Sequence, residues 1–168
     1  MKLRTRTLTA AVFAAFLLFP VACGTADIAA LVQTLGGAAS SIADIEGNSN
    51  LAAKLKVDTT AAADAVLNWK SGTPATEVIE ALNLVQDDLD LFPVGSEATA
   101  LIDLAIGTTE AIITEITSKA PAASSVAVAH VAHRAVTLTK PPKNAAEFKK
   151  QYQTIIAANP QLQKYALK

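Results

Sequence analysis

His130 and His133 are the residues of this sequence best suited to binding a metal, because they lie three positions apart. On a helix, that spacing can direct two imidazoles toward one ion. A zinc site needs a third and usually a fourth ligand, and no further ligand lies nearby in the sequence. We therefore expect ordinary surface or interface histidines and predict neither a metal nor another cofactor.

Three carboxylates gather at the end of a predicted helix: Asp87, Asp88 and Asp90. At a helix C-terminus they oppose the helix dipole, each by roughly 0.3–1 kcal/mol. The simplest interpretation is a solvated face. A sharper hypothesis is that Lys149 and Lys150, much further along the chain, dock against this acidic end.

Cys23 is the only cysteine of the chain, so it can form no intramolecular disulfide. The chain begins with the basic sequence MKLRTR, and residues 8–22 form an apolar run of 15 residues without a charge. This run is shorter than the roughly 20 residues of a membrane-spanning helix. A basic start, an apolar middle and small residues at the end are typical of a secretory signal.

Residues 1–24 resemble the signal of a bacterial lipoprotein, with small Ala22 before Cys23 and Gly24 after it. The segment departs from the usual pattern at Pro20, where leucine is commonest. The resemblance implies export, removal of the signal, and a palmitate-type lipid anchor on Cys23 in the cell membrane or outer membrane. Two or more acyl chains hold a protein stably without a spanning helix. Ordinary secretion and retention of the segment as an anchor remain the alternatives.

Beyond the signal, apolar residues recur at spacings of three, four and seven, which predicts amphipathic helices. We expect helices over residues 27–46, 50–70, 74–92, 97–118 and, after a gap, 144–158. The expected inward faces contain Ile28, Leu31, Val32, Leu35, Ile42, Ile45, Leu51, Leu55, Ala62, Val66, Trp69, Val78, Ile79, Leu82, Val85, Leu89, Phe92, Leu101, Ile102, Leu104, Ala105, Ile112, Ile113, Ile116, Phe148, Tyr152 and either Ile155 or Ile156.

Two features disturb this helical pattern. Gly36 and Gly37 lie in the middle of the first helix, where each costs about 1 kcal/mol relative to alanine. They indicate a kink or a close helix–helix contact, although simple tolerance of the pair is the plainest interpretation. Asp58 and the threonines after it prefer helix caps to helix interiors, so the second helix can be interrupted there.

Short connections make neighbouring helices antiparallel. We therefore predict an all-α fold: an antiparallel up-down-up-down four-helix bundle with an extra C-terminal helix after a linker. The charge also differs between the bundle and the C-terminal part of the chain: the net charge is −10 over residues 23–119 and +6 over residues 120–168. The expected segments are a signal peptide (1–22), an acidic bundle (23–119), a linker (120–142) and a basic C-terminal helix and tail (143–168).

The C-terminal helix is expected to begin at Asn144, and Glu147 follows three residues later, which resembles a capping box. We expect the tail either to fold onto the acidic body or to meet an anionic surface.

The sequence contains no recognisable arrangement of serine, histidine and aspartate, and no glycine-rich phosphate loop. We therefore predict that the protein is not an enzyme, and an acidic body argues against nucleic acid as a partner. The expected function is a membrane-tethered helical scaffold or binding protein of the bacterial cell envelope. Its partner would be an envelope protein or an anionic polymer. The alternative is a protein that binds a lipid or small apolar ligand, or acts on membranes.

Overall fold

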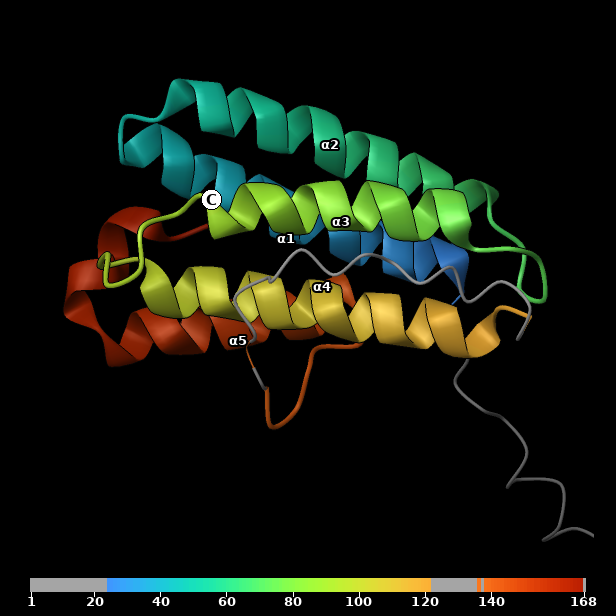
Figure 1. The fold of residues 1–168 in the computed structure, drawn as a ribbon. Coiled ribbons are helices and arrows are strands. Elements are labelled where there is room, and N and C mark those ends of the chain that lie inside the picture. The colour runs from blue at the N-terminus through green and yellow to red at the C-terminus, as the bar shows by residue number, and fades with distance from the viewer. Residues whose placement is uncertain (1–23, 122–135, 137, 168) are drawn as a thin grey trace, which may run out of the picture.

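A computed structural model of the chain describes residues 24–121, 136 and 138–167 (Figure 1). Every regular element within these residues is a helix, which confirms the all-α prediction. The elements are α1 (Thr25–Ile45), α2 (Ser49–Asn68), α3 (Thr76–Asp90), α4 (Thr99–Lys119), α5 (Ala145–Ala158) and the 3-10 helix η2 (Pro160–Tyr165).

Helix α1 lies at the centre of the packing and contacts α2, α4, α5 and η2. Helix α3 packs between α2 and α4, and α5 also contacts α4. In Figure 1 the long helices run roughly along one direction, and η2 follows the end of α5, which it contacts. The C-terminal tail thus folds onto the body of the protein.

One hydrophobic core joins all of these elements, and it contains most of the residues expected to face inward. Phe148, Tyr152 and Ile156 of α5 belong to it, together with Leu162 and Tyr165 of η2. Ile45 is an exception. It is 44 % exposed because it is the last residue of α1, where the chain turns away from the core.

Gly36 brings α1 and α2 into close contact. A Cβ atom added to Gly36 would lie 2.1 Å from Oγ1 of Thr59, whereas one added to Gly37 would meet nothing within 4 Å. Near this contact Ser40 Oγ donates to the carbonyl oxygen of Ala52 at 3.1 Å. The interpretation that the helix merely tolerates a glycine is therefore wrong for Gly36. Two helices can approach this closely only where one of them has no side chain.

Helix α2 is continuous through Asp58, so the expected interruption is wrong. Asp58 forms an ion pair with Lys54 one turn earlier, at 3.0 Å, which supports the helix. Thr60 Oγ1 donates to the carbonyl oxygen of Lys56 at 2.7 Å. These side chains bond along the helix instead of competing with it.

The start of α5 confirms the predicted capping box. Asn144 Oδ1 accepts a hydrogen bond from the Glu147 amide at 2.9 Å. Glu147 Oε2 accepts in return from the amide of Lys143, one residue before the cap, also at 2.9 Å. The first bond satisfies an amide that a helix start otherwise leaves free, and the second ties the residue before the cap to the first turn.

Among the described residues, α1 alone is long and apolar enough to cross a membrane by length and composition. Its most apolar window is 61 % buried against the rest of the protein. A buried core helix has the same composition, and the packing of α1 accounts for its apolar residues.

Candidate functional site

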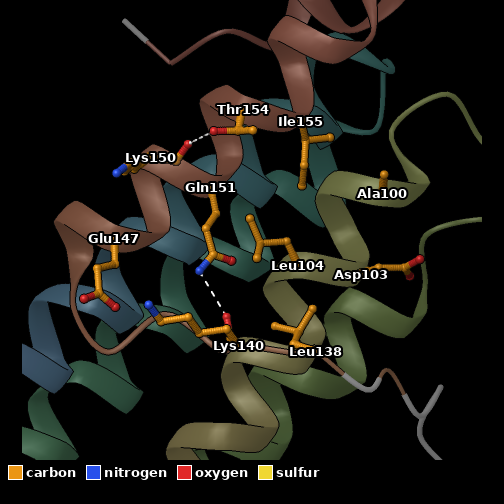
Figure 2. Close-up of a pocket in the computed structure, with 10 residues that line it drawn as sticks. All are labelled: Ala100, Asp103, Leu104, Leu138, Lys140, Glu147, Lys150, Gln151, Thr154 and Ile155. Carbon is orange, nitrogen blue, oxygen red and sulfur yellow. Dashed lines mark hydrogen bonds between the residues drawn. The ribbon is translucent and has the colours of Figure 1, made fainter.

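A groove of about 650 Å³ lies between α4 and α5 (Figure 2). Pockets that bind small ligands typically have volumes of roughly 300–1,000 Å³. The lining residues are Ala100, Asp103, Leu104, Leu138, Lys140, Glu147, Lys150, Gln151, Thr154 and Ile155. They combine an apolar floor with polar and charged edges, as a binding site for an amphipathic molecule would.

Helical spacing explains why these side chains line one groove. On α4, Ala100, Asp103 and Leu104 are three and four residues apart and therefore share a face. On α5 the lining residues follow the same rule from Glu147 to Ile155. Each helix thus presents one stripe to the groove.

Residues just before α5 also line the groove, and they pack against α4 at Gly107. A Cβ atom added to Gly107 would lie 2.6 Å from Cγ of Leu138 and 3.2 Å from the carbonyl oxygen of Val136. The absence of a side chain at Gly107 therefore lets this segment lie against α4. Leu138 consequently contributes an apolar side chain to the groove.

Hydrogen bonds fix several of the polar groups around the groove. Gln151 Nε2 donates to the carbonyl oxygen of Lys140 at 3.1 Å, which ties α5 to the segment before it (Figure 2). Thr154 Oγ1 donates to the carbonyl oxygen of Lys150 at 2.8 Å. Within the described parts of the chain, neither lysine forms an ion pair. Two cationic ammonium groups are therefore available at the groove.

A second polar cluster lies between α2 and α3. Lys54 forms ion pairs with both Asp58 and Asp88, and the side chain of Asp88 is fully buried. Burial raises the pKa of Asp88, and its hydrogen bond with Asp58 raises it further. The hydrogen bond to Asp88 is in turn the main reason that the pKa of Lys54 is raised. This cluster joins two helices, because Lys54 belongs to α2 and Asp88 to α3.

The described residues contain no group of three or more histidine, cysteine, aspartate or glutamate side chains able to hold a metal ion. At the groove the described residues offer apolar side chains, two ammonium groups, two carboxylates, an amide and a hydroxyl.

No protein-family model matches the chain, and comparison with curated proteins and with solved structures finds no match either. No relative therefore assigns a role to any of these residues.

The residues singled out by their chemistry in the sequence have different outcomes. Cys23, His130 and His133 lie outside the described residues, so their expected roles stay predictions. Lys149 and Lys150 are exposed on α5, which packs against α1, α4 and η2.

The acidic end of α3 has its own partners. Asp88 pairs with Lys54 of α2, and α3 packs chiefly against α2 and α4. Docking of Lys149 and Lys150 against this end stays a prediction.

The tail also meets the body through residues that charge patterning did not reveal. Lys164 of η2 forms an ion pair with Glu97 at 2.7 Å, and this ion pair raises the pKa of Lys164. Its ammonium also lies 4.9 Å from the ring centre of Tyr165. The apolar spacing of Leu162 and Tyr165 was the signal that could have revealed this contact, since both are buried.

Proposed function

We propose that the protein is exported and carries a lipid on Cys23. It would act at the cell membrane or outer membrane as a helical scaffold or binding protein without catalytic activity. The observation that carries this proposal is the position of Cys23, the sole thiol, directly after the apolar run and two positions before α1 begins at Thr25. A lipid there would tether the helices with only Gly24 between, so the N-terminal end of α1 would face the bilayer.

The opposite end of the helices would then point away from the membrane and be free to meet a partner. It carries the turn after α1, the loop between α3 and α4, and η2 (Figure 1). Leu91 and Val94 of this loop are 64 % and 78 % exposed. These apolar side chains suit an envelope protein, whereas exposed Lys149 and Lys150 suit an anionic polymer. Helices α1 to α4 would form the up-down-up-down bundle of such a scaffold.

Metabolic labelling with a palmitate analogue tests the lipid anchor. We expect the wild-type chain to be labelled and to fractionate with membranes, and Cys23→Ala to lose both properties. Ser40→Ala is a suitable control because Ser40 is a buried side chain unrelated to the signal. Absence of label on the wild-type chain, or equal label on Cys23→Ala, would contradict the proposal.

The groove between α4 and α5 supports a second function, binding of a lipid or small apolar ligand. Native mass spectrometry of the purified full chain should then detect a bound species of lipid size. Ala100→Trp should remove it, because Ala100 is an exposed residue that lines the groove and a larger side chain there fills the space. Retention of the same species by Ala100→Trp would exclude the groove as its site.

A further inference from the structure

We propose that the groove between α4 and α5 binds a single-chain amphiphile with an anionic head group. Its chain would lie on Leu104, Leu138 and Ile155, and its head group between Lys140 and Lys150. This inference rests on the second proposed function, ligand binding, and adds the chemical class of the ligand.

The floor of the groove suits an acyl chain. Leu104 comes from α4, Ile155 from α5 and Leu138 from the segment between these helices, and Figure 2 shows the three side chains together in the middle of the groove. Leu138 and Ile155 are only partly buried, so their apolar surface still contacts solvent. An acyl chain that covers this apolar surface removes it from water, which is favourable.

One edge of the groove suits an anion. Lys140 and Lys150 lie on the same side of the groove in Figure 2, and Asp103 lies on the opposite side. The carboxylate of Glu147 also lies near the lysines, but it accepts a hydrogen bond from the Lys143 amide at the start of α5. Lysine ammonium groups are compact charges with three donors each, which suits a carboxylate or a phosphate.

The polar groups beside the lysines are arranged to stabilise this edge. The bond from Gln151 to the carbonyl oxygen of Lys140 fixes the backbone of one lysine relative to α5, which carries the other. The distance between the backbones that carry the two ammonium groups is therefore set by the fold. The head group would therefore meet two lysines whose backbones are already held relative to each other.

The test uses 11-(dansylamino)undecanoic acid and its uncharged methyl ester as fluorescent probes. The protein is the full chain with Cys23→Ala, so that no covalently attached lipid competes. We expect the acid to bind more tightly than the ester. Lys140→Glu with Lys150→Glu should weaken binding of the acid by about tenfold and leave binding of the ester unchanged. Lys149→Glu is the matched control, because Lys149 is an exposed neighbour that does not line the groove.

Displacement of the bound acid identifies the head group. Displacement by decanoate or by decyl phosphate supports the proposal and distinguishes a carboxylate from a phosphate. Equal displacement by decyltrimethylammonium would overturn it, because a cationic head group would then bind as well as an anionic one.

Two further outcomes separate this inference from the function on which it rests. Failure of both probes to bind, or unchanged binding of both by Ala100→Trp, would overturn ligand binding at the groove altogether. Ala157→Trp is the control for that variant, since Ala157 is exposed on α5 outside the groove. Equal affinity for acid and ester, with no effect of the lysine substitutions, would overturn only the anionic head group.

Discussion

The hydroxyl of Tyr165 donates a hydrogen bond to Oε1 of Glu46 at 2.7 Å, across 119 residues of sequence. Tyr165 ends η2, and Glu46 directly follows α1. The hydroxyl of Tyr152 on α5 donates to the carbonyl oxygen of Tyr165 at 2.9 Å. The last helical residue of the chain is therefore fixed both to the first helix and to the helix before it.

Tyr165→Phe should lower the free energy of unfolding by about 1 kcal/mol, because it removes a single hydrogen bond while keeping the buried ring. Urea unfolding followed by circular dichroism measures this change. Glu46→Gln should cost less, since the amide oxygen still accepts. Equal and additive losses for the two substitutions would show that Tyr165 and Glu46 do not interact.

Apolar burial should hold the tail more strongly than charge does. Leu162→Ala should cost about 2–4 kcal/mol, because it opens a cavity beneath η2. Lys164→Met should cost much less than Leu162→Ala, because Lys164 and Glu97 are each about half exposed and water screens their ion pair. Added salt should remove only the loss caused by Lys164→Met, because salt screens an exposed ion pair. A larger loss for Lys164→Met than for Leu162→Ala would show that charge dominates.

The adjacent glycines of α1 should respond in opposite ways to alanine. Gly36→Ala places a Cβ against Thr59 and should destabilise the protein by about 1–3 kcal/mol. In Gly37→Ala the added Cβ faces open space, so the substitution should stabilise the protein by about 0.5–1 kcal/mol. Thermal unfolding of both variants makes the comparison. Adding Thr59→Ala should recover part of the stability lost in Gly36→Ala, and a failure to do so would place the strain elsewhere.

The buried carboxylate of Asp88 should make stability depend on pH. Burial and Asp58 raise the pKa of Asp88, so the folded state binds a proton more tightly than the unfolded chain. The free energy of unfolding of the wild type should therefore rise, relative to Asp88→Asn, as pH falls from neutral toward about 4, the ordinary aspartate value. Urea unfolding at several pH values gives the difference. A difference that is constant or of opposite sign would contradict the raised pKa.

Removal of the lysine tests the same cluster at neutral pH. Lys54→Met leaves the buried Asp88 without its cation and should cost about 1–3 kcal/mol. Lys56→Met is the matched control, because its ion pair with Asp44, at 3.4 Å, is exposed and should contribute less than about 1 kcal/mol. Similar losses for the two variants in urea unfolding would show that burial of Asp88 does not matter.

Helix positions and inward faces could be predicted from the sequence because they depend on the local period of apolar residues. The stripe of Val78, Leu82 and Leu89 is buried as predicted. The sequence could not show which helices meet, because that depends on how faces fit together. Gly36 illustrates this: its role depends on Thr59 in another helix.

The candidate groove was beyond sequence analysis for the same reason. Its lining comes from α4, α5 and the segment before α5, and each contributes residues that look ordinary in their own helix. Charge patterning left open whether the basic tail folds onto the acidic body or meets an anionic surface, and it did not show that Lys164 would meet Glu97. Pairing of single charges depends on which side chains the packed helices bring within reach.

The sequence by itself determined that the described chain is helical, where each helix lies and which face is apolar, because these properties follow from neighbouring residues. Only the tertiary structure decided that α5 and η2 complete the core and that a groove opens beside α5. The burial of Asp88 beside Lys54 and the hydrogen bond between Tyr165 and Glu46 likewise depend on the tertiary structure. Those contacts link residues distant in sequence, and close packing of whole helices selects them.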